Sequence, residues 1–441
     1  MKNNLLVVLV TLVLLFSIGF GIFIGAYLFF EQHKGIIFSG VMIEGYNFGG
    51  LTKKQARKRL DKLAEPLLKT PLVLEGDNDK WLLRPEDIEI RLKSEEVLNK
   101  AFGVGRRGNL LERAISVWHS SKYGRNLEVE VDYNEKKVTE ILRQISNTIN
   151  IKPSNAYLDL ETGVVINAQI GKRLNIKESR DRIISRFNNL EDIPVKLVIE
   201  EKEPEVDDQK LKELNLTNQL SSYETSFSTK KENRVHNIEL AAQKVNATFL
   251  KSGEVFSFNQ VVGNRNLVTG FKRAVEIVNQ EFVTGVGGGV CQVSSTLYNS
   301  VLLGDFKVIE RHNHSRPVGY VSLGRGATVY NNYLDFRFEN SSSYPIMILA
   351  TVIGNRLKVA IMGQGRNYKV KISTSELEIL NYDRVKKKAE LEKRKLVKKG
   401  KNGYRVKIIK KVFAGNKLIR KELISQDVYQ PIDEVIKVPT K

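Results

Sequence analysis

The chain has 441 residues and a formal net charge of +20 at pH 7, and it is long enough for two or three domains, each with its own core. It has one cysteine, Cys291, which excludes an intramolecular disulfide and a zinc site built from several cysteines.

The amino-terminal region contains a long apolar stretch, residues 5–30, without a charged side chain. At about 1.5 Å per helical residue it can cross a hydrocarbon core of roughly 30 Å. It is longer than the apolar core of a cleavable signal peptide and has no small-x-small cleavage site, so we predict an uncleaved signal anchor over residues 1–34. The polar composition of the rest predicts a single pass through the cell membrane, with the bulk of the chain outside. A buried core helix is the alternative.

Two stretches then share one order of elements. Apolar periodicity and turn residues predict helix, hairpin and helix at 52–60, 71–84 and 94–102, and again at 134–145, 156–166 and 177–187. We interpret residues 35–200 as a duplicated α-β-β-α module. It has no cluster of catalytic side chains, and His119 between the copies is interpreted as a surface or packing residue.

The polar, proline-containing run that starts at Glu201 predicts a linker over residues 201–221. Glycines and short apolar strands at 328–330, 333–338 and 346–353 then predict a mixed α+β domain over residues 222–366. From about Lys369, apolar and basic residues alternate, which predicts a small all-β domain over residues 369–441. The fold class is therefore α+β multidomain.

Most of the net positive charge lies near the carboxyl end, with 17 Lys or Arg between Arg384 and Lys421 against two acids, Glu390 and Glu392. Such a block binds nucleic acid, anionic lipid or an anionic polymer. Only Tyr404 and Phe413 interleave it, so no base-stacking platform is indicated, and we predict no nucleic-acid partner. We expect anionic wall polymers as partners of this region; a solvated face on an ordinary domain is the alternative.

The densest chemical motif is Gly285-Val-Gly-Gly-Gly-Val-Cys-Gln-Val-Ser-Ser-Thr-Leu-Tyr-Asn-Ser300. Its glycines permit positive φ, and the helical spacing of the apolar residues that follow places Cys291 at a helix start. There the free backbone N–H groups and the helix dipole favour a thiolate and can receive an oxyanion. We predict Cys291 as a nucleophile; a small, buried and inert thiol is the alternative.

The segment Arg311-His312-Asn313-His314 supplies candidate bases about twenty residues later. In an extended segment His312 and His314 point to the same side, so either could take the thiol proton while the other orients it or binds substrate. Hydrogen bonding in a loop is the alternative. A zinc site formed with Cys291 is a further alternative, but no HExxH helix or clustered carboxylates accompany these residues, and we predict no metal and no cofactor. His236 is interpreted as structural.

At these residues the chain resembles the VanW family of Gram-positive cell-envelope proteins. The resemblance covers residues 223–365 and includes Gly253-Glu-Val-Phe-Ser-Phe-Asn259, the block from Gly287 to Asn299, Arg311-His-Asn-His-Ser315 and Ala327-Thr-Val329. The duplicated module is similar to a peptidoglycan-binding domain that commonly precedes this family's main domain. The tail resembles the glycine-containing extracellular module called G-five.

The resemblance implies L,D-transpeptidase activity, with which some family members are associated. Cys291 would then attack a peptidoglycan stem peptide, with His312 and His314 as the other catalytic residues. The residues expected to contact substrate are Gly288, Gly289, Gln292, Ser294, Ser295 and Arg311. The chain departs from the family at one position. Where the family commonly has Gly-x-Asp-Ala-Thr, this chain has Gly324-Arg-Gly-Ala-Thr328, so Gly326 replaces the aspartate. Asp335 and Asp305 are the candidate replacements.

We therefore predict a membrane-anchored cysteine L,D-transpeptidase that cross-links stem peptides at the cell wall. A non-catalytic peptidoglycan-binding protein with an unreactive Cys291 is the main alternative, and Gly326 favours it. An amidase or endopeptidase, which passes its acyl group to water, is a third class. The deciding observation is whether the Cys291 sulfur lies within about 4 Å of a His312 or His314 nitrogen in an open cleft.

Overall fold

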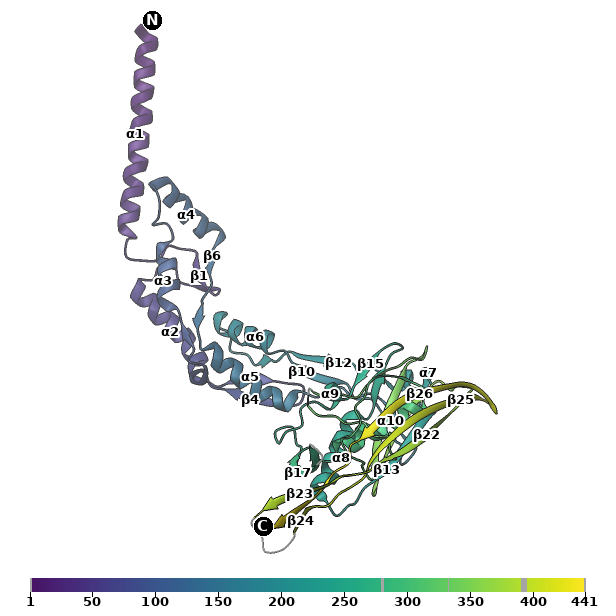
Figure 1. Cartoon of the computed structure of the whole chain (residues 1–441). Coiled ribbons are helices and arrows are strands. Elements are labelled where there is room, and N and C mark those ends of the chain that lie inside the picture. The colour runs from purple at the N-terminus through teal and green to yellow at the C-terminus, as the bar shows by residue number, and fades with distance from the viewer. Residues whose placement is uncertain (1, 279–280, 332, 390–394, 440–441) are drawn as a thin grey trace. The chain divides into compact units, whose positions relative to one another are not determined.

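The computed structural model describes residues 2–278, 281–331, 333–389 and 395–439 (Figure 1). The chain forms two compact units. The first comprises Met1–Lys152 and Gly171–Lys202, and the second comprises Pro153–Ile170 and Glu203–Lys441.

An uninterrupted helix, α1 (Lys2–Gln32), stands at the amino terminus, as predicted (Figure 1). Its segment Leu5–Gln32 is long and apolar enough to cross a membrane, and the most apolar 18 residues of it are not buried by the rest of the protein. This is compatible with a membrane anchor or a signal sequence. The last turns pack onto the first unit, where Phe30 is buried and the guanidinium of Arg113 lies 4.1 Å from the centre of its ring.

Five further helices of the first unit are α2 (Lys53–Lys69), α3 (Ser94–Gly103), α4 (Leu110–Tyr123), α5 (Glu135–Ile149) and α6 (Ile176–Asn188). Its strands are β1 (Val41–Ile43), β2 (Tyr46–Asn47), β3 (Leu72–Glu75), β4 (Lys80–Leu83), β5 (Arg91–Leu92), β6 (Arg125–Leu127), β7 (Val131–Asp132), β10 (Gly171–Leu174), β11 (Val195–Lys196) and β12 (Ile199–Lys202). Helix α2 begins where the sequence predicts, because Thr52 and Gln55 form a reciprocal capping box.

The two stretches interpreted as a duplicated module contain the predicted helices, but their hairpins differ in placement. In the first stretch β3 and β4 pair within the first unit, and β11 extends them in parallel. In the second stretch the hairpin of β8 (Tyr157–Leu158) and β9 (Val165–Ile166) belongs to the second unit. The common order of elements therefore does not produce a common sheet, and the duplication stays a prediction.

The second unit is built on the antiparallel sheet β13-β21-β20-β14, made of β13 (Gln219–Ser226), β14 (Thr248–Leu250), β20 (Ile346–Ile353) and β21 (Arg356–Gly363). Alternate residues of β20 and β21 face opposite cores, as strand geometry requires. On one face Ile348 and Val359 share a core with α8 (Glu232–Val245) and α10 (Val290–Leu303). This core positions the candidate site.

The other face of the sheet is covered by the segment predicted as a linker. Within it lies a short helix, α7 (Asp208–Glu213), and Val206, Leu211 and Leu216 are fully buried against Met347 and neighbouring sheet residues. Three apolar side chains spaced through a polar run are thus enough to fix this segment on the sheet.

The remaining elements of the middle region are α9 (Phe258–Val262), β15 (Val255–Ser257), β16 (Arg273–Val278), β17 (Glu281–Val286), β18 (Lys307–Glu310) and β19 (Arg337–Glu339). The strand predicted at 328–330 forms only an isolated bridge between Tyr330 and Leu334. Its backbone bonds elsewhere, since Thr328 N donates to His312 O at 2.8 Å. Just before this segment, the Ser295 hydroxyl accepts from Ala327 N at 2.9 Å and the Ser294 hydroxyl donates to Ala327 O at 2.7 Å.

The carboxyl-terminal region, residues 369–439, is a small β domain, as predicted (Figure 1). It contains β22 (Lys369–Leu380), β23 (Arg384–Ala389), β24 (Lys395–Lys398), β25 (Gly403–Ala414), β26 (Lys417–Tyr429) and β27 (Glu434–Pro439), in the sheets β22-β25-β26 and β23-β27-β24. Residues 390–394 of the basic segment lie outside the described residues. The buried side chains of Val406, Ile408 and Tyr429 pack against Leu323, so this β domain shares a core with the middle region.

Candidate functional site

The hairpin of β16 and β17 leads into a glycine turn that presents Cys291 as the second residue of α10. Gly287 and Gly289 have φ of +98° and +112°, a conformation that favours glycine. A Cβ on Gly288 would lie 2.6 Å from the Val275 carbonyl oxygen. The turn therefore requires its glycines, and the prediction that Cys291 lies at a helix start is confirmed.

Helix α10 is almost completely enclosed. From Val290 to Leu302, a run that the structure describes in full, every residue is buried except Cys291, which is partly exposed. Cys291 is therefore the one residue of this run that is not fully enclosed, and it also packs against the core of the middle region.

The thiol of Cys291 donates a hydrogen bond to the carbonyl oxygen of Val329, with Sγ 3.4 Å from the oxygen. Burial raises the pKa of the Cys291 thiol, and this outweighs the nearby positive charge of Arg265, which lowers it. The resting site therefore holds a protonated thiol, whereas the helix start alone predicts a stabilised thiolate.

The two histidines lie in different surroundings. His312 is partly exposed, and its Nε2 lies 3.0 Å from Glu310 Oε1. His314 is buried, and its Nε2 lies 3.2 Å from the Tyr320 hydroxyl. Within the described part of the chain, no hydrogen bond joins either imidazole to Cys291.

His314 has an unusual environment. Its Nδ1 is buried and has no hydrogen-bond partner among the described residues, and it lies 2.6 Å from the position that a Cβ on Gly326 would occupy. Desolvation, and then the charge of Arg311, lower the pKa of His314 to about 4, so the imidazole is neutral at neutral pH. Gly326 thus faces the buried Nδ1 of His314.

Tyr320 is the hydrogen-bond partner of this histidine. Burial raises the pKa of Tyr320, and the negative charge that Cys291 would carry raises it further. No motif in the sequence selects a single tyrosine in a loop, so Tyr320 is not among the predicted site residues.

Arg311 is predicted to contact substrate, but its guanidinium forms hydrogen bonds with other groups of the protein. It donates to Asp427 Oδ1 at 2.7 Å, to Gly326 O at 2.7 Å and to Gly324 O at 3.2 Å. Burial lowers the pKa of Arg311, but the hydrogen bond and charge of Asp427 prevail and raise it. Arg311 therefore fixes the loop opposite His314.

The other predicted substrate contacts also have partners in the protein. Gln292 donates from Nε2 to Thr225 Oγ1 at 3.0 Å and accepts from Arg234 at Oε1 at 2.6 Å. The Ser294 and Ser295 hydroxyls bond to Ala327, as described above, and the Ser295 hydroxyl also donates to Cys291 O at 2.7 Å. The carbonyl oxygens of Gly288 and Gly289 accept from Asn237 Nδ2 and Gln292 N.

Neither candidate replacement for the missing carboxylate pairs with a histidine among the described residues. Asp335 accepts from Ser257 Oγ at 2.5 Å and from Asn259 N at 2.9 Å, and Asp305 pairs with Lys410 at 2.7 Å. Nor do any three His, Cys, Asp or Glu residues of the described ranges form a group suited to a metal ion. His236, interpreted as structural, lies with Nε2 2.8 Å from Gly270 O.

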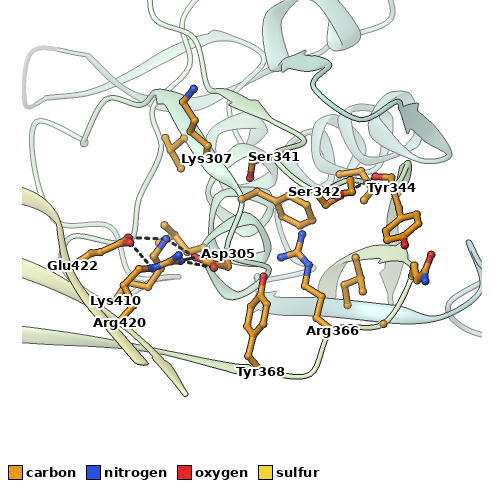
Figure 2. A pocket seen from close by; sticks show the side chains of 18 of the residues that line it. Asp305, Lys307, Ser341, Ser342, Tyr344, Arg366, Tyr368, Lys410, Arg420 and Glu422 are labelled. Carbon is orange, nitrogen blue, oxygen red and sulfur yellow. Dashed lines mark hydrogen bonds and ion pairs between the residues drawn. The ribbon is translucent and has the colours of Figure 1, made fainter. Parts of the chain in front are cut away.

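A separate hollow of about 720 Å³ lies where the middle region meets β25 and β26 (Figure 2). Asp305, Lys410, Arg420 and Glu422 form a network of ion pairs on one side of it, and Arg366 and Tyr368 line another part. None of the predicted catalytic or substrate-contact residues lines this hollow.

Three protein families match the chain. Residues 233–362 match the family described as "VanW like protein", residues 81–193 match a proposed peptidoglycan binding domain, and residues 371–441 match the G5 domain. "Uncharacterized protein YoaR" of Bacillus subtilis (strain 168) is 36% identical over 233 residues, which cover 52% of this chain and 75% of that protein.

The "Vancomycin B-type resistance protein VanW" of Enterococcus faecalis (strain ATCC 700802 / V583) is 30% identical over 126 residues, covering 27% of this chain and 46% of that protein. Among solved structures, the crystal structure of HP0197-G5 is 20% identical with a TM-score of 0.12, covering 16% of this chain and 97% of that one. The IgA1 protease G5 domain is 14% identical with a TM-score of 0.15, covering 17% and 95%.

Proposed function

Because the chain belongs to the VanW family and carries a peptidoglycan-binding and a G5 domain, we propose that it modifies peptidoglycan as a cysteine L,D-transpeptidase. In this proposal α1 is an uncleaved anchor in the cell membrane, and the rest of the chain works outside at the wall. Anchor and binding domains raise the effective concentration of a substrate fixed in the wall.

The observation that carries the proposal is the partial exposure of Cys291, alone along the enclosed part of α10, at the positive end of the helix dipole. A helix buried on all other sides holds its nucleophile rigidly. The tightly packed glycine turn in front of it fixes the start of the helix.

The reaction assigned to the thiol has two steps. The sulfur attacks the carbonyl carbon of the third stem residue, a C–S bond forms, the amide C–N bond breaks, and the thiol proton passes to the departing amine of the terminal D-amino acid. An amine of a neighbouring strand then attacks the thioester carbon, a new amide C–N bond forms, the C–S bond breaks, and a proton from the amine returns to the sulfur.

Proton transfer in this proposal is assigned to His314 through Tyr320. The neutral imidazole of His314 can accept a proton, and its Nε2 lies 3.2 Å from the Tyr320 hydroxyl. Because burial raises the pKa of Cys291, the thiol proton must be removed by this relay before the sulfur attacks. His312, beside Glu310, is assigned to orienting the substrate.

The test is to incubate the full chain, in detergent, with a disaccharide-tetrapeptide. A transpeptidase gives an acyl adduct on Cys291 by mass spectrometry, released D-amino acid and cross-linked dimers. Cys291→Ala abolishes all three, while Arg356→Gln, on the surface of β21, retains them. Tripeptide without dimers would assign a hydrolase instead.

A non-catalytic wall-binding protein is the second candidate, and the raised pKa of Cys291 favours it, as does the lack of a partner for His314 Nδ1. The rate of alkylation by iodoacetamide separates the two candidates. A nucleophilic thiol reacts in the folded protein below pH 8, whereas an inert one reacts only after unfolding. A folded chain that forms no adduct but binds peptidoglycan would establish the binding role.

A further inference from the structure

Two arginines flank the glycine turn that presents Cys291. The Cγ of Arg234, on α8, lies 3.0 Å from the position of a Cβ on Gly289. The Cβ of Arg265, which follows α9, lies 3.4 Å from that of a Cβ on Gly287. Two elements that are separate in the sequence therefore lay arginine side chains against the two ends of one short turn.

Both guanidiniums are held by neutral groups. Arg234 donates to the side-chain oxygen of Gln292 at 2.6 Å, and Gln292 is itself fixed by Thr225. Arg265 donates to the side-chain oxygen of Asn259 and to Asn331 O at 3.4 Å, and its buried Nε has no partner among the described residues. Amide oxygens set the direction of both side chains without cancelling their charge.

The carboxylates near this turn do not form ion pairs with either arginine in the part of the chain that the structure describes. Asp335, whose charge acts on Arg265, bonds to Ser257 and Asn259 instead. Burial lowers the pKa of both arginines, but guanidinium remains protonated at neutral pH. Two partly desolvated cations beside one turn are unfavourable unless an anion joins them.

We infer that Arg234 and Arg265 bind a carboxylate of the peptide whose scissile amide lies at Cys291. The choice of a peptide rests on the proposed function; the preference for a carboxylate follows from the two guanidiniums. Their planar forks match carboxylate oxygens, and the positive end of the α10 dipole adds to the same positive field. In a stem peptide the carboxylate is either the terminal α-carboxylate, on the residue that leaves, or one on an internal residue.

The test uses the full chain with Cys291→Ala, which prevents turnover, and three synthetic tetrapeptides of one sequence. The first has a free carboxyl terminus, the second a terminal carboxamide, and the third has every carboxylate amidated. We expect the third to bind about 10- to 100-fold more weakly than the first. A second peptide that binds like the first identifies an internal carboxylate, and one that binds like the third identifies the terminal one. Equal binding of all three would overturn the inference.

Variants of the two arginines test whether Arg234 and Arg265 cause the preference for a carboxylate. Arg234→Gln and Arg265→Gln should each reduce the affinity ratio between the first and third peptides toward one, and the corresponding lysine variants should retain part of it. Arg356→Gln, an exposed arginine of β21 paired with Glu224, should leave the ratio unchanged. Glutamine variants that fold and keep the parental ratio would refute the assignment. If they do not fold, the peptide comparison on the unmutated site still decides.

The two proposals fail separately. If the protein prefers carboxylates but the wild-type chain forms no acyl adduct, the transpeptidase proposal is refuted and the carboxylate site is retained. If the adduct forms but no carboxylate preference is found, the carboxylate site is refuted and the transpeptidase proposal is retained.

Discussion

Arg311 donates to Asp427 at 2.7 Å, and both side chains are more than nine-tenths buried. Arg311 precedes the candidate histidines, whereas Asp427 lies on β26 of the carboxyl-terminal β domain. The Tyr429 hydroxyl, also on β26, accepts from Gly324 N at 2.9 Å. The β domain therefore supports both loops around His314.

Removing the carboxylate of this pair should destabilise the second unit strongly. Asp427→Ala leaves the Arg311 charge buried without compensation, which costs about 3–5 kcal/mol. Both tryptophans, Trp81 and Trp118, lie in the first unit, so fluorescence does not report on this change. Hydrogen exchange of α10 peptides, read by mass spectrometry, measures it directly.

The matched control for this variant is Glu378→Ala. Glu378 pairs with Arg405 at 2.6 Å in the same β domain, but both side chains are about half exposed. We expect a cost of only about 0–1 kcal/mol for this exposed pair. Equal costs for Asp427→Ala and Glu378→Ala would show that the buried pair does not support the site.

The second unit should lose stability as the pH falls from about 6.5 to about 4. The pKa of His314 is about 4 in the folded protein and ordinary, near 6.5, in the unfolded chain, so in this window the unfolded chain binds a proton that the folded one does not. The loss is up to about 3 kcal/mol. Carboxylates titrate near the lower end of the window, so the comparison must be made with a variant.

His314→Gln should remove this contribution, and His119→Gln, which alters an exposed imidazole on α4, should not. Exchange of α10 peptides at pH 7 and pH 5, corrected for the intrinsic exchange rate, gives the difference. Identical pH profiles for wild type and His314→Gln would contradict the assigned protonation state.

The glycine turn gives a prediction that needs no substrate. Gly288→Ala places a Cβ 2.6 Å from the Val275 carbonyl oxygen, so the β16–β17 hairpin must shift, at a cost of about 1–3 kcal/mol. Gly319→Ala meets no atom within 4 Å and should change stability by less than about 0.5 kcal/mol. Thermal unfolding of the two variants, with exchange of α10 peptides as the local probe, compares them. A tolerated Gly288→Ala would mean that the turn is less tightly packed than described.

The basic β domain should bind anionic wall polymers through exposed lysines. Replacing Lys386, Lys387 and Lys388 of β23 by glutamine should weaken binding roughly 10-fold at low ionic strength, and added salt should reduce the difference. The same change at the exposed residues Lys54, Lys58 and Lys62 of α2 removes equal charge elsewhere. Sedimentation with purified wall polymer measures both; equal weakening would indicate net charge rather than a localised surface.

Local signals in the sequence predicted much of the fold. The capping box at Thr52 and the apolar spacing after Cys291 place helix starts correctly, because both depend on residues close in the chain. The packing of Val206 and Leu211 was not predictable in this way. Their partners on β20 and β21 lie well over a hundred residues away, and the surrounding acids resemble a linker.

The residues of the candidate site also differ in whether a local motif predicts them. Glycines 287–289 and the position of Cys291 follow from one motif, whereas Arg234, Arg265 and Tyr320 reach it from three separate segments. Arg311 was selected from its motif, but its partner Asp427 is 116 residues away, and only the fold shows that its donors are already used. Two residues that form an ion pair but lie far apart in the sequence produce no periodic pattern from which the pair could be predicted.

The joint between α1 and the first unit has a mechanical consequence. Phe30 is buried, Arg113 stacks on its ring, and Arg106 donates to His33 O at 2.8 Å. These contacts fix the end of the helix to the folded protein. Under the proposed anchoring, a tilt of the helix in the bilayer turns the first unit by the same angle. The membrane then sets the orientation of the first unit as well as its distance from the bilayer. A change in bilayer thickness therefore changes the angle at which the first unit meets the wall.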